Sequence, residues 1–199
     1  MKEEWHQLLD SSTTLFARKG IRATSTDEIA RHCGLHKRCF YEHFNSKESL
    51  VARIISTWLE KTDRYLSFNR HISSNAIIEM SNFFRIAERV VQTIQPVFFR
   101  DLREMYPSIW ASVVHFRENQ LAAFLRLNIR RGLHEDIYRR NLDQALLEKL
   151  YFTPLALVVE DRIPPECPIP SACRELNIIY LHGLVNLKGM KFIYEKQVN

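Results

Sequence analysis

The sequence predicts an all-α protein, with an N-terminal three-helix unit followed by a larger helical bundle. Apolar residues recur every three or four positions along most of the chain, which is the period of an amphipathic helix. Only 5 Gly and 7 Pro interrupt the 199 residues, and this leaves room for long helices. A hydrophobic content of 46% is enough to bury a full core, in one domain together with a smaller one.

The first predicted helix covers residues 4–19. Its apolar side chains share one face and are Trp5, Leu8, Leu9, Leu15 and Phe16. Gly20 follows directly and ends the helix, because glycine tolerates the backbone conformation found just past a last turn. The apolar face needs a partner, and we expect Ile29, Phe40 and Phe44 of the next segment to supply it.

Two short helices joined by a tight turn are predicted between Thr24 and Lys47. Ser25 and Glu28 have the spacing of a capping box, so the first of these helices begins near Thr26. Gly34 ends it by adopting a positive φ. The second helix covers residues 37–44, and a pair of short helices around such a turn is a helix-turn-helix.

The second short helix has two different sides. Phe40 and Phe44 are four residues apart and point together into the core. Most of the polar side chains of the helix fall on the opposite side, and they are Lys37, Arg38, Tyr41 and Glu42. A short helix with cationic and hydrogen-bonding side chains outward suits insertion into the major groove of DNA.

Several short motifs follow one another at fixed spacing between Leu8 and Leu50. They are Leu15-Phe16, Lys19-Gly20, Thr24-Ser25, Ile29-Ala30, Gly34, Phe40-Tyr41, His43-Phe44 and Ser46-Lys47-Glu48-Ser49-Leu50. In this order and spacing they resemble the TetR family of bacterial transcriptional regulators. The resemblance implies a DNA-binding head, a C-terminal domain that senses a small molecule, and a homodimer.

The resemblance assigns four residues to contacts with the DNA backbone, namely Thr26, Tyr41, His43 and Lys47. Their hydroxyl, phenol, imidazole and ammonium groups can all bond phosphate oxygens. For His43, a structural hydrogen bond within the protein is an equally good interpretation.

Base recognition is expected from the outer side of the second short helix. Arg38 is the foremost candidate, because a guanidinium bonds guanine O6 and N7 together. Lys37 is expected to contact a base or a phosphate, Glu42 a cytosine amino group, and Cys39 a thymine methyl group. Arg38 and Glu42 are one helical turn apart, so an ion pair between them is the alternative.

The rest of the chain is predicted to form further helices. They cover residues 47–70, 76–94, 97–105, 109–133, 142–160 and 172–196, with a proline-containing loop at 162–171. The first begins at Ser46, which caps it. We therefore expect a DNA-binding domain at residues 1–46, and a ligand-binding and dimerisation domain at residues 47–199.

Aromatic side chains are dense in the middle of the chain. A packed core explains them, and an apolar ligand cavity with a few polar groups is the alternative. The candidate pocket residues are Phe83, Phe84, Phe98, Trp110, Val114, His115, Asn119 and Phe124. The sequence does not indicate the identity of an effector, and no cofactor is expected.

The last two long helices are apolar enough to form a four-helix interface with a second copy. The candidate interface residues are Leu146, Leu150, Leu176, Ile179, Gly183, Leu187 and Met190. Gly183 and Gly189 are expected to permit close backbone approach. Burial of these helices within one chain is the alternative.

Charge and cysteine content set further bounds. The net charge is +5, but residues 1–50 hold 8 Lys and Arg against 7 Asp and Glu, so the DNA prediction rests on placement. No apolar run reaches the length of a membrane span and no leader is evident, which favours a cytoplasmic protein. Four cysteines are expected to be free, and we predict no metal site, although Cys33, His36 and Cys39 have near-ligand spacing.

The function that these patterns favour is a homodimeric repressor that binds a palindromic operator and is released by a small-molecule effector. A protein of the same fold that responds to a protein partner, or to no ligand, is the alternative. An enzyme is disfavoured, because the chain contains no glycine-rich phosphate loop, nucleophile elbow or His-Glu-x-x-His zinc motif.

Overall fold

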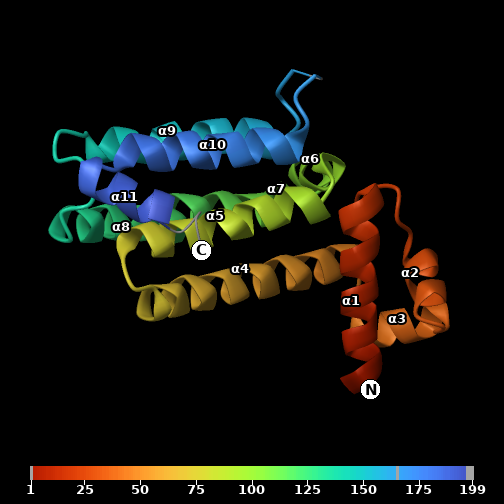
Figure 1. The fold of residues 1–199 in the computed structure, drawn as a ribbon. Coiled ribbons are helices and arrows are strands. Elements are labelled where there is room, and N and C mark those ends of the chain that lie inside the picture. The colour runs from red at the N-terminus through yellow and green to blue at the C-terminus, as the bar shows by residue number, and fades with distance from the viewer. Residues whose placement is uncertain (1, 165, 196–199) are drawn as a thin grey trace. The chain divides into compact units, whose positions relative to one another are not determined.

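A computed structural model describes residues 2–164 and 166–195. Within these ranges the regular elements are helices, and an isolated bridge pairs Tyr138 with Val185 (Figure 1). This confirms the predicted all-α class. The helices are α1 (Lys2–Lys19), α2 (Thr26–His32), α3 (Lys37–His43), α4 (Lys47–Ile72), α5 (Ala76–Thr93), α6 (Pro96–Met105), α7 (Pro107–Phe116), the π-helix η1 (Arg117–Leu121), α8 (Ala122–His134), α9 (Gln144–Val159), α10 (Ile169–Leu184) and α11 (Leu187–Glu195).

The chain forms two compact units, and each unit is built from two separate stretches of sequence. Unit 1 holds the residues up to Thr62 together with Thr93–His115. Unit 2 holds Asp63–Gln92 together with the residues from Phe116 onward. Helix α4 begins in unit 1 and ends in unit 2. The helix-turn-helix therefore shares its compact unit with α6 and most of α7, two helices that lie far from it in sequence.

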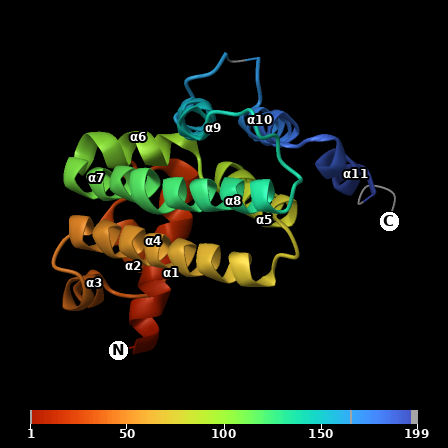
Figure 2. The ribbon, with the colours of Figure 1, turned by 90° about the vertical axis from the view of Figure 1, so that its left-hand side faces the viewer.

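The core of unit 1 joins α1, α2 and α3 to α4 and α6. Phe16, Phe40 and Phe98 are almost completely buried in it. Helix α6 also ties down the end of α1, because the amide of Gln95 donates to the carbonyl of Ala17 at 2.8 Å. The views in Figures 1 and 2 agree in placing α1 beside α2 and α3. The predicted three-helix unit is thus completed by α4 and α6.

The core of unit 2 contains a tight aromatic cluster. The Tyr151 ring lies 4.9 Å from Tyr180, 5.5 Å from Phe84 and 5.7 Å from Phe83, measured between centroids. Phe124 lies 5.0 Å from Phe83. Burial raises the pKa of Tyr180, and the Tyr180 hydroxyl donates to the Leu147 carbonyl at 3.1 Å. These side chains form a packed core, which is the first of the two explanations proposed from the sequence for the many aromatic residues.

A buried ion-pair network connects α4, α5 and α8 inside unit 2. The Glu79 carboxylate is fully buried and lies 3.1 Å from Arg131 and 3.4 Å from Arg70. Asn128 donates to the same carboxylate at 3.1 Å. Arg131 also pairs with Glu135 at 2.7 Å. The sequence pattern did not reveal this network, because Glu79 occupies an inward position of a helix that otherwise looks amphipathic.

The predicted C-terminal helix and the preceding loop are both wrong in their bounds. The loop ends earlier, because Pro168 caps α10 and Pro170 fits its first turn, where a missing amide hydrogen costs nothing. The single helix expected at 172–196 is two helices, with Val185 in an extended conformation between them. Residue 196 lies outside the described residues.

Two contacts explain the break between α10 and α11. The Arg139 amide donates to the Leu184 carbonyl at 2.8 Å, and the Asn186 amide donates to the Ile137 carbonyl at 3.0 Å. The Asn186 side chain then caps α11 by accepting from the Gly189 amide at 2.9 Å. A Cβ at Gly189 would come within 2.2 Å of the Ile137 carbonyl, so the predicted close approach is present there.

The cysteines are free in the structure, as expected from the sequence. Cys33 and Cys39 are half-buried, Cys167 is exposed and Cys173 is buried. Burial raises the pKa of the Cys173 thiol to about 11. Among the described residues, no helix combines the length and the apolar character needed to cross a lipid bilayer.

Candidate nucleic-acid interface

Helix α2 is positioned by local signals at both ends. The Ser25 hydroxyl accepts a hydrogen bond from the Glu28 amide at 3.1 Å, as the capping prediction requires. The Glu28 carboxylate binds the Lys19 ammonium of α1, which ties the start of α2 to the end of the first helix. Gly34 adopts a φ of +69° after α2, and the turn then leads into α3.

Helix α3 is anchored by aromatic residues on its inner side. Phe40 is completely buried, and its ring centroid lies 5.9 Å from that of Phe44. Phe44 stacks in turn on Trp5 of α1 at 6.4 Å. This packing fixes the rotation of α3 about its axis, and therefore decides which side chains face outward.

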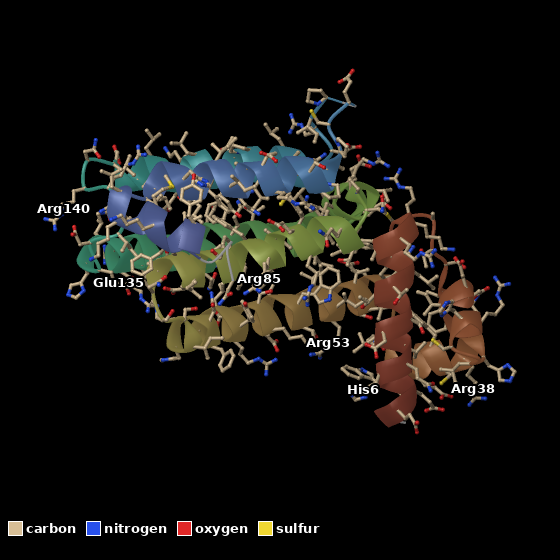
Figure 3. The ribbon with its side chains drawn as sticks, in the orientation of Figure 1. His6, Arg38, Arg53, Arg85, Glu135 and Arg140 are labelled. Carbon is tan, nitrogen blue, oxygen red and sulfur yellow. The ribbon has the colours of Figure 1, made fainter. Side chains whose placement is uncertain are left out.

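The outer side of α3 carries the predicted base contacts. Lys37, Arg38, Tyr41 and Glu42 are all exposed. Arg38 has a side chain that is 90% exposed, and Figure 3 shows it at α3. A helix that presents an arginine, a lysine and a tyrosine on one open side can donate hydrogen bonds to base edges and phosphates.

The outer side chains also pair with one another. The Arg38 Nε atom lies 3.1 Å from the Glu42 carboxylate, which is the alternative that the sequence left open. Lys37 lies 2.8 Å from Asp27 of α2, and this hydrogen bond raises the pKa of Lys37. Ion pairs this exposed are weak, because water screens them. A phosphate or a guanine can therefore replace either carboxylate at little cost.

Three of the four predicted phosphate contacts lie at two places. Thr26 and Tyr41 lie together, with their hydroxyl oxygens 3.5 Å apart. Lys47 is half-buried at the start of α4, and its Nζ atom lies 6.0 Å from the centroid of the Phe16 ring. Burial lowers the pKa of Lys47, although the nearby Asp101 carboxylate opposes this shift.

Two predicted DNA contacts, Cys39 and His43, are turned toward α1 instead of the outer side of α3. Cys39 is half-buried, and the His43 side chain is only 12% exposed. The Nε2 atom of His43 lies 3.6 Å from the Glu4 carboxylate. Sequence reasoning missed Glu4 as a neighbour, because no local pattern links a residue of the first helix to α3.

The start of α4 contains a second feature that the sequence did not reveal. Ser46 and Ser49 cap each other, since the Ser49 amide donates to the Ser46 hydroxyl at 3.1 Å and the Ser46 amide donates to the Ser49 hydroxyl at 3.2 Å. The expected cap at Ser46 is therefore present. A serine at both positions is the signal that indicates the reciprocal bond.

The candidate pocket residues are divided between the two compact units. Phe83, Phe84 and Phe124 belong to the core of unit 2. Phe98 and Trp110 belong to the core cluster of unit 1, and Val114 is half-buried. His115 and Asn119 are exposed. A pocket lined by these residues remains a prediction.

The candidate interface residues are mostly on open surface. Leu146, Leu150, Ile179 and Leu187 have exposed fractions of 50%, 52%, 68% and 87%. Leu176 and Met190 instead pack partly against the core of unit 2. A Cβ added at Gly183 would meet nothing within 4 Å, so this glycine makes no close approach within its own chain.

Comparisons with known proteins agree with the geometry of the head. The model of the family described as bacterial regulatory proteins of the tetR family matches residues 8–54. The HTH-type transcriptional repressor KstR2 of Rhodococcus jostii is 44% identical over 54 residues, which is 27% of this chain and 26% of the relative. The chain spans between 18% and 26% of the lengths of three curated relatives that it matches in this region.

Solved structures extend the similarity of fold to most of the chain. A TetR-family transcriptional regulator from Agrobacterium tumefaciens superimposes with a TM-score of 0.75 at 13% identity, covering 93% of this chain and 99% of that one. The transcriptional regulator FadR from Bacillus subtilis, solved in complex with stearoyl-CoA, gives a TM-score of 0.64 at 12% identity, covering 90% and 98%. Residues 8–54 therefore match the N-terminal segment of the TetR family, and most of the chain has the same fold as a solved regulator of that family.

Proposed function

We propose that this protein is a homodimeric repressor that binds a palindromic operator and is released when a small molecule binds the C-terminal domain. The observation that carries the proposal is the outer side of α3. Lys37, Arg38, Tyr41 and Glu42 are exposed there, and the buried Phe40 fixes their direction. A rigid helix with this set of side chains suits direct readout in the major groove.

Apolar side chains on α9 and α10 support a homodimer. These two helices lie against each other in unit 2. Their exposed apolar residues are Leu146, Leu150, Leu157, Ile178 and Ile179. Two copies that pair these helices form a four-helix interface, and its two-fold axis gives the two heads the symmetry of a palindrome.

A relative's ligand supports a small-molecule effector. The FadR structure of similar fold was solved with stearoyl-CoA. Native mass spectrometry of the purified protein tests for a retained ligand, and addition of the extracted compound to a DNA complex then tests release. An effector bound by this chain should lower its affinity for the operator, since repression ends when the complex dissociates.

Replacing Arg38 with Ala is expected to weaken operator binding by about 1–3 kcal/mol and to leave non-specific binding nearly intact. The loss follows from the bidentate contact of a guanidinium with guanine. Fluorescence anisotropy with operator and scrambled duplexes measures both affinities. The matched variant is Lys47→Ala, which should weaken both duplexes alike and reduce the salt slope by about 0.9. Equal losses on both duplexes for Arg38→Ala would remove Arg38 from base recognition.

Replacing Ile179 with Glu is expected to convert the dimer into a monomer of 23.6 kDa. Ile179 is 68% exposed in the single chain, so the change should alter the folding stability of the monomer by no more than about 0.5 kcal/mol. In the dimer, by contrast, the new charge would be buried, which is unfavourable. Light scattering after size exclusion measures the mass. Leu127→Glu on α8, at a residue 41% exposed, is the control that stays dimeric. A monomeric wild-type protein would contradict the proposed interface.

A further inference from the structure

Three potential metal ligands meet between α1 and α3. Cys39 and His43 are four residues apart on α3, so both point to the same side of the helix. Glu4 reaches them from α1. The carboxylate, thiol and imidazole ligand atoms all lie within 4.8 Å of one another, and the His43 Nε2 atom is 3.6 Å from the Glu4 carboxylate.

The chemistry of this cluster matches a zinc-like ion. Zinc takes sulfur, nitrogen and oxygen ligands in a tetrahedron, with ligand atoms about 3.3–3.6 Å apart for ordinary bond lengths. The His43 to Glu4 distance of 3.6 Å already fits this separation. The remaining separations require small side-chain rotations. Three protein ligands leave the fourth position for water, as in open zinc sites.

The surroundings of Cys39 favour a bound cation. Cys39 is half-buried, and the carboxylates of Glu4 and Glu42 place negative charge near it. The same negative potential attracts a divalent ion, whose charge stabilises the thiolate when the thiol proton leaves for solvent. The neighbouring Cys33 is engaged elsewhere, since its thiol donates to the Gln7 carbonyl at 3.5 Å. The cluster is therefore a different set from the Cys33, His36 and Cys39 pattern in the sequence.

We propose that Glu4, Cys39 and His43 bind Zn²⁺ through carboxylate, thiolate and imidazole, and that the ion fixes α3 against α1 and strengthens DNA binding. The second part rests on the proposed function. The site lies on the inner side of α3, so Lys37, Arg38 and Tyr41 remain exposed on the outer side that faces DNA. Exchange of one thiol proton for Zn²⁺ adds one positive charge next to the recognition helix, and this favours a polyanion.

Cobalt substitution tests the site without any DNA. Untagged protein is first treated with a chelator and a phosphine reductant, and both reagents are then removed. The protein is titrated with Co²⁺, because this ion accepts the same ligands as Zn²⁺ and gives a thiolate-to-metal absorption band. The band should appear at one equivalent and be displaced by Zn²⁺. It should disappear in Cys39→Ser, weaken in Glu4→Gln and His43→Gln, and remain in Cys33→Ser and Glu3→Gln. Circular dichroism checks that each variant is folded, and a band that survives in Cys39→Ser would overturn the site.

DNA binding tests the effect of the ion. Zn²⁺ is expected to raise operator affinity by about five-fold or more, at the lower end of couplings measured between two sites. Glu4→Gln should bind the operator like the metal-free wild type and lose the response to Zn²⁺, while Glu3→Gln keeps it. Unchanged or reduced affinity with Zn²⁺ would overturn the coupling.

The two experiments separate the metal site from the proposed function. A protein that gives the thiolate band but binds no DNA fragment, with or without Zn²⁺, would overturn the proposed function and uphold the site. A protein that binds its operator but gives no band would overturn the metal site alone.

Discussion

Replacing Phe40 with Ala is expected to destabilise unit 1 by about 3–5 kcal/mol and to abolish DNA binding. Phe40 is completely buried and is the residue that holds α3 in the core. Its ring contacts those of Tyr41 at 5.2 Å and Phe44 at 5.9 Å. Removing the ring leaves a cavity under the recognition helix and frees its rotation. A loss of this size is a large part of the total stability of a domain, which is about 5–15 kcal/mol.

Urea unfolding followed by circular dichroism measures the loss in Phe40→Ala. Phe68→Ala is the matched control, because Phe68 is 58% exposed on α4 and its removal should change stability by less than about 0.5 kcal/mol. If Phe40→Ala unfolds at the wild-type urea concentration and still binds the operator, Phe40 does not anchor α3.

Replacing Arg131 with Met is expected to destabilise unit 2 by about 3 kcal/mol, at the low end of the range for a broken buried ion pair. The Glu79 carboxylate would remain fully buried, with Arg70 still 3.4 Å from it but without its closer partner. Arg131 also donates to the Ser73 carbonyl at 2.7 Å, so the turn between α4 and α5 loses a support.

The same unfolding measurement checks this expectation. Arg140→Met removes an exposed pair with Asp136, and it should cost no more than about 1 kcal/mol. Adding Glu79→Gln to Arg131→Met should restore part of the stability, since no charge is then left buried without its partner. Equal stability of Arg131→Met and the wild type would show that the network is not a determinant of stability.

The helix-turn-helix was predictable because its signals are local. Ser25 as a cap, Gly34 with a positive φ and the inward pair of Phe40 and Phe44 each depend on a few neighbouring residues. Local propensity and hydrophobic spacing therefore agree with the structure in this segment. The exposed row on α3 follows from the same periodicity.

The features that escaped prediction depend on residues far apart in the sequence. The apolar pattern continues through Val185, but α10 ends there because residues 137–139 pair with the backbone of residues 184–186. In the sequence, Glu79 has the character of a surface residue, and its burial is explained only by its ion pair with Arg131, which lies far away along the chain. Glu4 meets Cys39 and His43 only once α1 has packed on α3. Such contacts are set by tertiary packing, which neither periodicity nor capping signals encode.

The measurement that tests the central claim most directly is a selection of genomic DNA fragments with the purified protein at moderate salt, followed by sequencing of the retained DNA. Enrichment of one short palindrome is the expected result, because two heads related by a two-fold axis contact two half-sites. Uniform retention at low salt that disappears as salt rises would mean that the head binds phosphates alone. That outcome would contradict sequence-specific repression by this protein.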